Sequence, residues 1–361
     1  MVALRDALDI VSRYTNDKKS DSGYHVVVLR DGKAMATDGE VGCLVPCEVA
    51  TVGLAVDCGA LLKMVKAIGD AEIEKAKGRR LIVSGGGSKF TISAIPKKNE
   101  PTMAEIPGDL LWRKITADQV RAIVGLIAIT GKERGEANYA LSGIRFTPDW
   151  IAAASSSSLS VVWVSGSVLS PFTAPSEILK DLSGEVSIAV QNRRIFVREE
   201  NTGQIRWGLG IQAEWPDQTV SGVLGAAREA KGRRSCKVDI DDISVVAKQA
   251  GVVAGGTLSS FRMTLKNAEV IIDGKNKMGE AGTSDFSGSV DVDTGKKKIK
   301  GDMYVGFLPA LLCSGADAVK ASSGDEYYMS VAGELDPIIL WSGGGDVITE
   351  VLVLPQRLLD W

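Results

Sequence analysis

Apolar residues recur at helical spacing near the start of each third of the chain, with one every three or four positions. This is the pattern of one buried face of an amphipathic helix. The segments are residues 4–11, 115–124 and 238–246. A shorter segment of the same kind lies in the middle of each third, at residues 59–65, 175–180 and 304–312. The spacing predicts two helices in each third.

Strand patterns fill the intervals between these helices. Segments rich in β-branched residues either alternate or run continuously apolar, at residues 24–29, 81–84, 90–93, 186–190, 195–198, 268–272 and 338–341. Turn-forming residues separate several of them, at residues 30–33, 191–192 and 273–274. The order helix, strands, helix, strands, repeated three times, predicts an α+β fold of three similar domains, each with two helices on antiparallel sheets.

The length of 361 residues fits two or three domains. Linker-like composition occurs at residues 97–107, which are rich in Pro, Lys and Glu, and at residues 220–235, which carry Gly, Ala and a basic run. At a domain junction, such a run indicates a solvated linker more than a nucleic-acid patch. The predicted domains are residues 1–107, 108–230 and 231–361.

The composition narrows the classes of partner and compartment. The net charge is −3, which argues against a tight nucleic-acid binder but not against a loose one. No apolar run is long enough to cross a bilayer, so we expect no membrane partner and a cytoplasmic location. Five scattered cysteines indicate a reducing compartment and no disulfide framework: Cys43, Cys47, Cys58, Cys236 and Cys313.

The chain carries no convincing catalytic constellation. The loop from Gly85 to Lys89 is glycine-rich but lacks the spacer of a P-loop and is flanked by strands, so a hairpin turn is favoured. Cys43 and Cys47 have no further cysteine pair or histidines to complete a zinc site, since His25 is the only histidine. We therefore expect no catalytic residue, no metal, no cofactor and no enzymatic activity.

The carboxyl-terminal segment carries the most informative motif, an apolar run closed by Pro355 and Arg357. It resembles the terminal signature of bacterial-type DNA sliding clamps, the beta subunit of DNA polymerase III. Residues 138–146 and the Trp215-Pro216-Asp217 run are also similar to clamp segments, in the same order. The resemblance covers essentially the whole chain.

One clamp motif departs from the family pattern. Ser155 to Ser158 lie in the segment, residues 152–161, where clamps carry Ala-Thr-Asp-Gly-His-Arg-Leu, and Ser156 to Ser158 replace its Gly-His-Arg before Leu159. The serines remove a cation and an imidazole, so the preferred partner peptide should differ. Such divergence would suit a phage-encoded, plasmid-encoded or otherwise specialised clamp.

The resemblance implies a fold, an assembly and a set of partners. Three clamp domains per chain would pair head to tail with a second chain, giving a homodimeric ring that encircles double-stranded DNA without reading its sequence. Its implied role is that of a processivity factor for the replicative DNA polymerase, placed on DNA by a clamp loader and shared with other proteins that carry clamp-binding motifs. The implied location is the bacterial cytoplasm, or the host cytoplasm for a phage protein.

The resemblance also suggests which residues contact each partner. The expected partner-peptide pocket consists of Leu141, Ala154, Ser157, Ser158, Leu159, Pro216, Leu352, Leu354, Pro355, Arg357 and Leu358. The expected DNA-facing cations are Arg5, Arg13, Lys18, Lys19, Lys63, Lys66, Arg121, Lys132 and Arg134. The expected dimer contact is Val252 with Val253. Solvated helix faces and ordinary core packing remain alternative interpretations of these residues.

Two other functions remain open at this stage. A specialised clamp could tether a nuclease or repair factor in place of a polymerase, and the serine segment motivates this alternative. An enzyme could instead use the Gly85 to Lys89 loop. Loss of a measured activity on Lys89→Ala would favour the enzyme, whereas a clamp should scarcely respond to that change.

Overall fold

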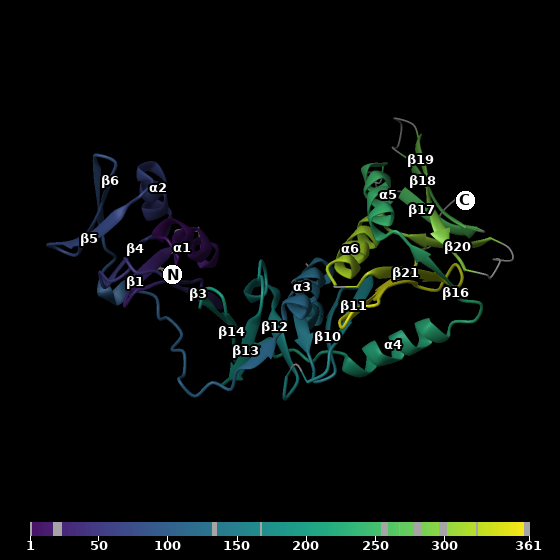
Figure 1. The fold of residues 1–361 in the computed structure, drawn as a ribbon, viewed down its shortest axis with the longest axis horizontal. Coiled ribbons are helices and arrows are strands. Elements are labelled where there is room, and N and C mark those ends of the chain that lie inside the picture. Colours follow the sequence, from purple (N-terminus) through teal and green to yellow (C-terminus); the bar gives the residue numbers. More distant parts are fainter. Residues whose placement is uncertain are drawn as a thin grey trace. The chain divides into compact units, whose positions relative to one another are not determined.

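The computed structural model describes residues 2–16, 24–131, 136–166, 168–253, 259–266, 268–277, 283–295, 302–322 and 324–356. The chain forms two compact units, and neither is a continuous stretch of sequence (Figure 1). The first unit combines residues 1–116 with 177–210, and the second combines residues 117–176 with 211–361. No helix in the described residues is long and apolar enough to span a membrane.

Within its described residues, the first unit is built on an eight-stranded antiparallel sheet in the order β4-β1-β2-β3-β15-β14-β13-β8. Its strands are β1 (Val26–Arg30), β2 (Lys33–Thr37), β3 (Val41–Pro46), β4 (Leu54–Asp57), β8 (Arg113–Ile115), β13 (Val186–Gln191), β14 (Arg194–Glu199) and β15 (Ile205–Leu209). The junction between early and late strands is β3 against β15, where Gly42 lies opposite Trp207. Segments distant in sequence thus share one sheet.

Helices α1 (Leu4–Val11) and α2 (Cys58–Ile68) pack against each other beside β1 to β4. The first buries Leu4, Ala7, Leu8 and Val11, the expected i, i+3, i+4, i+7 stripe. Asp57 caps the second, accepting a hydrogen bond from the Ala60 N–H at 2.6 Å. A separate three-stranded sheet contains β5 (Glu72–Ala76), β6 (Arg80–Gly85) and β7 (Ser88–Ser93).

The second unit contains a twelve-stranded sheet within its described residues, in the order β12-β9-β10-β11-β23-β22-β21-β16-β19-β18-β17-β20. Its strands are β9 (Gly143–Phe146), β10 (Trp150–Ala154), β11 (Ser158–Trp163), β12 (Phe172–Pro175), β16 (Arg234–Val238), β17 (Ser259–Lys266), β18 (Glu269–Lys277), β19 (Thr283–Asp293), β20 (Met303–Phe307), β21 (Glu326–Val331), β22 (Ile338–Gly343) and β23 (Ile348–Val353).

Helices cover both faces of this sheet, with α3 (Ala117–Leu126) and α6 (Pro309–Lys320) over β11, β22 and β23 and α5 (Ile240–Val253) over β18 and β19. These three helices lie on one side, and α4 (Asp217–Glu229) lies on the other (Figure 1). Strand β23 alternates between them: Val351 and Val353 face Gly315 of α6, whereas Leu352 joins the core cluster that includes Leu224 of α4. A strand buried on both faces needs a continuous apolar run, which accounts for the pattern of the carboxyl-terminal segment.

Most predicted elements are confirmed. All seven strand segments lie within or overlap strands, and the helices predicted at residues 4–11, 59–65, 115–124 and 238–246 correspond to α1, α2, α3 and α5. The loop Gly85 to Lys89 is a hairpin turn, with Gly86 and Gly87 at φ +55° and +78°. The five cysteines, all described, form no disulfide.

Four sequence predictions are wrong. Residues 175–180 form the end of β12 and a single 3₁₀ turn (Ser176–Ile178), and residues 304–307 are a strand that precedes α6. Residues 273–274 lie inside β18. Most of the expected linker at residues 220–235 is the helix α4, whose apolar face finds a sheet to cover, so packing outweighs the low helix propensity of its glycines.

Candidate functional site

One row of side chains crosses six strands of the second unit on a single face of the sheet. Register places Ala154 opposite Leu159, Leu159 opposite Leu352, and Leu352 opposite Ile339. Ile339 is opposite Ser330, and Ser330 is opposite Ser235. Directly opposite residues point to the same face of a sheet. The row is therefore apolar at the β10 end and carries hydroxyls at the β16 end.

Helix α4 covers the apolar end of this row. Val220, Leu224 and Ala227 form its buried stripe and join the core cluster that contains Ala154, Leu159 and Leu352. The helix is anchored at its start by Asp217, whose two carboxylate oxygens accept from Arg145 Nε at 3.1 Å and Nη2 at 2.6 Å. A carboxylate in the first turn also complements the helix dipole.

Several residues expected in the partner-peptide pocket do come together. Ala154, Leu159 and Leu352 are buried in one core cluster, with exposed fractions of 7%, 7% and 0%, and Leu141 packs against it. Pro216 immediately precedes α4 and is exposed, while Leu354 and Pro355 are half-buried after β23. Arg357 and Leu358 lie outside the described residues. The apolar centre of the expected pocket is therefore covered by α4.

The serine segment forms a tight turn between β10 and β11. Ser155 Oγ accepts hydrogen bonds from the Ser157 N–H at 3.3 Å and from the Ser158 N–H at 3.1 Å. These serines border a cavity of about 310 Å³, together with Leu141 and with Leu311 at the start of α6. The Leu354 N–H donates to the Ser157 carbonyl at 3.0 Å. The cavity thus brings together Leu141, Ser157 and Ser158, and the backbone of Leu354 is bonded to the turn that borders it.

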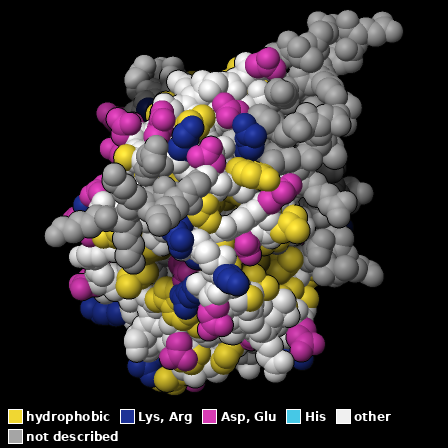
Figure 2. All heavy atoms as spheres, turned by 90° about the vertical axis from the view of Figure 1, so that its right-hand side faces the viewer, with side chains coloured by type: hydrophobic (Ala, Val, Ile, Leu, Met, Phe, Trp, Pro, Cys, Tyr) yellow, Lys and Arg dark blue, Asp and Glu magenta, His cyan; other side chains and the backbone are white. Residues whose placement is uncertain are grey.

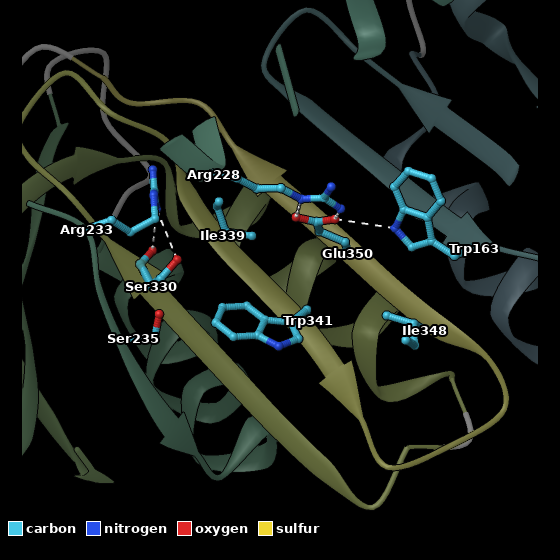
Figure 3. Close-up of a pocket in the computed structure, with 9 residues that line it drawn as sticks. All are labelled: Trp163, Arg228, Arg233, Ser235, Ser330, Ile339, Trp341, Ile348 and Glu350. Atoms are coloured by element: carbon cyan, nitrogen blue, oxygen red, sulfur yellow. Dashed lines mark hydrogen bonds and ion pairs between the residues drawn. The ribbon is translucent and has the colours of Figure 1, made fainter. Parts of the chain in front are cut away.

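A second cavity, of about 530 Å³, lies on the α4 face beyond the covered part of the row (Figure 3). Nine residues line it: Trp163, Arg228, Arg233, Ser235, Ser330, Ile339, Trp341, Ile348 and Glu350. Two indole rings and two isoleucines give it apolar walls. Arg228, at the end of α4, pairs with Glu350 and lies 5.2 Å from the centre of the Trp163 ring.

The expected DNA-facing cations lie on exposed helix faces. Arg5 is on α1, Lys63 and Lys66 are on α2, and Arg121 is on α3. Three cations have carboxylate partners: Lys66 with Asp9 at 2.7 Å, Arg13 with Asp181 at 2.6 Å, and Arg121 with Asp118. Lys18, Lys19, Lys132 and Arg134 lie outside the described residues.

Charges of both signs are mixed on the surface. Figure 2 shows lysine and arginine side chains interspersed with carboxylates on the described part of one face, with no broad basic area there. On the helices of the last third, Lys248 pairs with Asp317 at 3.7 Å and Lys320 pairs with Asp241. Val252 near the end of α5 is 84% exposed, and Val253 follows it.

The features considered for catalysis occupy ordinary structural positions. Lys89 lies on β7 just after the hairpin turn, and its Nζ is 3.8 Å from Glu74 Oε1 on β5, across the intervening strand β6. His25 precedes β1, with Nε2 4.0 Å from Asp57. Among the described residues, no group of three or more His, Cys, Asp or Glu side chains is arranged to hold a metal ion.

Helix α4 and the cavity beside it were not predicted from the sequence. The signal was present: Val220, Leu224 and Ala227 follow i, i+4, i+7 spacing. Gly222 and Gly225 in the same segment favoured a linker. The row across the sheet requires strand register, which sequence patterns do not provide.

Comparison with solved structures identifies the architecture. A sliding clamp of DNA polymerase from Pseudomonas aeruginosa superposes with a TM-score of 0.76 at 17% identity, over 98% of this chain and 97% of that chain. The chain has the sliding-clamp fold. The Bacillus subtilis clamp gives 0.77 at 14% identity over 99% and 97%. The Thermotoga maritima DNA polymerase III beta subunit gives 0.76 at 17% identity over 99% and 97%. No protein-family model and no curated protein matches the chain.

Proposed function

We propose that this chain is a divergent DNA sliding clamp, a non-enzymatic processivity factor that encircles duplex DNA as a head-to-tail homodimer. The observation that carries the proposal is the match of nearly the entire chain, 98–99% of it, to solved chains named as DNA polymerase sliding clamps. The terminal motif and the Trp215-Pro216-Asp217 run support it independently, because each lies in the expected order.

The charge pattern fits a protein that stays on DNA by encircling it better than one that stays by binding it tightly. A protein with a net charge of −3 and mostly paired helix cations makes only weak, sequence-independent phosphate contacts. A closed ring needs no more than this, because topology holds it while weak contacts let it slide. In this proposal, Arg5 and Lys63 supply the first unit's phosphate contacts, and Val252 with Val253 contributes to the contact between chains.

The proposed partners are a DNA polymerase, a clamp loader and other proteins with short clamp-binding segments. We place their docking at the cavity bordered by Leu141, Ser157 and Ser158. In this proposal, Leu354, whose N–H donates to the Ser157 carbonyl, and the following Pro355 also contribute to the site. The serine hydroxyls favour a peptide that offers neutral hydrogen-bonding groups, because the turn has serines in place of the histidine and arginine of the clamp motif.

The test is retention on circular DNA. The purified full chain would be incubated with nicked circular plasmid, with its loader or at a concentration that allows spontaneous opening, and separated at high salt before and after linearisation. We expect a dimer by light scattering that stays on the circle and runs off the linear form. A monomer, or binding that ignores linearisation, would contradict the proposal.

A further inference from the structure

The cavity of about 530 Å³ beside α4 has the composition of a binding site and no role in the fold described so far. It lies over the part of the six-strand row, from Ile339 to Ser235, that α4 leaves uncovered. Its opening exposes Ile348, which is 44% accessible, and it contains the half-buried rings of Trp163 and Trp341. Large apolar side chains left open beside polar groups are the usual lining of an anchor pocket.

The two ends of this cavity differ in charge. In Figure 3 the ring of Trp341 lies between the Arg228–Glu350 pair and the Arg233 end. Arg228 and Glu350 neutralise each other, and Trp163 Nε1 also donates to Glu350 at 3.4 Å. The hydrogen bond to Glu350 raises the pKa of Arg228, which keeps this end an intact ion pair.

Arg233 is different because its described partners are neutral. Its Nη1 donates to the Ser330 carbonyl at 3.3 Å and to Ser330 Oγ at 3.0 Å, and its Nη2 donates to the Pro337 carbonyl at 3.1 Å. Nε is buried without a hydrogen-bond partner. Burial lowers the pKa of Arg233, with only partial compensation from Asp336 and Glu350. Within the described residues, no carboxylate lies within ion-pair distance of this guanidinium.

We propose that this cavity binds a peptide segment of a partner protein that carries a carboxylate beside a large apolar side chain. The carboxylate would accept hydrogen bonds from Arg233 and Ser235, and the apolar side chain would contact Trp341, Trp163 and Ile348. A guanidinium held in place by three hydrogen bonds loses little freedom when it meets a carboxylate, and such charge-assisted bonds are the stronger ones. The charge of the cavity selects an acidic segment over a basic one.

This site is separate from the cavity at Ser157 and Ser158, and it goes beyond the proposed function. It requires neither DNA nor a closed ring. Loss of peptide binding would leave retention on circular plasmid unchanged, so the two proposals can fail independently.

The experiment uses the full chain with ¹⁵N-labelled tryptophan, whose seven indole N–H signals can be followed by NMR. The probes are the peptide acetyl-Glu-Gly-Phe-amide and its Gln counterpart, which differ only in charge. We expect the Glu peptide to shift the Trp163 and Trp341 signals, assigned with Trp163→Phe and Trp341→Phe. It should bind at least about fivefold more tightly than the Gln peptide.

Arg233→Gln should abolish that fivefold preference, whereas Arg233→Lys should keep part of it. The matched control is Arg234→Gln, which removes the adjacent, exposed cation and should preserve the preference. An unchanged indole spectrum without peptide would verify that each variant is folded. Equal affinity of the two peptides, shifts confined to other tryptophans, a preference that survives Arg233→Gln, or no binding at millimolar concentration would each overturn the proposal.

Discussion

At the scale of single residues, the first unit contains a nearly buried ion pair. Glu199 Oε1 lies 2.6 Å from Arg206 Nη2, and their side chains are 7% and 6% exposed. Tyr14 and Cys43 interact electrostatically with both charges. Burial raises the pKa of Cys43 to about 12. Burial also raises the pKa of Glu199 against the attraction of Arg206. The pair is therefore important mainly because neither charge can be left alone.

Removal of the guanidinium should make stability strongly dependent on pH. We expect Arg206→Gln to lower the free energy of unfolding by about 3–5 kcal/mol near pH 8. The pKa of Glu199 would rise further, so the folded state would bind a proton more tightly than the unfolded state. The stability gained from this tighter proton binding is present at low pH, and it is lost as the pH rises through the pKa of Glu199 in the folded state. In urea unfolding, the difference in free energy of unfolding between Arg206→Gln and the unsubstituted chain should become smaller toward pH 5.

The matched control for this variant is Arg198→Gln. Arg198 pairs with Glu200 at 3.0 Å on the surface, with side chains 34% and 29% exposed. Exposed pairs contribute about 0–1 kcal/mol, so this change should be small at every pH. A deficit in Arg206→Gln that stays constant between pH 5 and 8 would argue against the uncompensated carboxylate.

A glycine at the strand junction gives a second test at this scale. A Cβ added at Gly42 would overlap the Trp207 ring and approach the Ala36 carbonyl to 2.8 Å. Overpacking of this kind lowers stability by about 1–3 kcal/mol, and we expect that loss for Gly42→Ala in thermal unfolding. Gly108→Ala, which meets no atom within 4 Å, is the control and should change stability little. Equal melting temperatures would show that the ring can move aside.

At the scale of elements, α4 is the feature that distinguishes this sheet face. Its stripe covers the apolar end of the row, and its last turn supplies Arg228 to the neighbouring cavity. One short helix therefore decides which part of the face is core and which part is open. Its stability rests on packing, because it contains two glycines and ends without a capping glycine.

Substitutions on the two sides of α4 should act in opposite directions. Leu224→Ala removes a buried side chain and should lower the free energy of unfolding by about 2–4 kcal/mol. Gly222→Ala meets no atom within 4 Å and should raise it by about 0.5–1 kcal/mol. Guanidinium unfolding of the full chain measures both. A stabilised Leu224→Ala would mean that α4 does not depend on its contact with the sheet.

The same helix shows what sequence can and cannot predict. Strands and the first helix of each third followed from apolar periodicity, and the Gly85 to Lys89 hairpin followed from its flanking strands. Residues 304–307 were wrongly predicted as helix because no polar residue separates this apolar strand from the helix that follows it. The alignment of Ser235 and Ser330 in one row with Ile339 depends on strand register, and the role of Arg233 depends on which carbonyls surround it. Neither is local information.

At the scale of the whole molecule, the paired cations predict weak DNA binding. Each phosphate contact contributes about one unit to the dependence of log affinity on log salt. In the proposed ring, Arg5→Ala and Lys63→Ala should each lower that slope by about one, uniformly across DNA sequences. Arg13→Ala should lower it less, because Asp181 already pairs with Arg13. Binding of short duplexes, measured across a salt series, gives these slopes. Identical slopes in all variants would mean that DNA does not contact Arg5, Lys63 or Arg13.

The pairing of β3 with β15 has a consequence for synthesis on the ribosome. Strand β3 is complete early in translation, but the strand that covers its edge is encoded near the middle of the chain. At about 5–20 residues per second, that edge waits on the order of ten seconds for its partner. Until then it is an open template for the same strand of another nascent chain. Ribosomes that translate this message close together would be where mispairing begins.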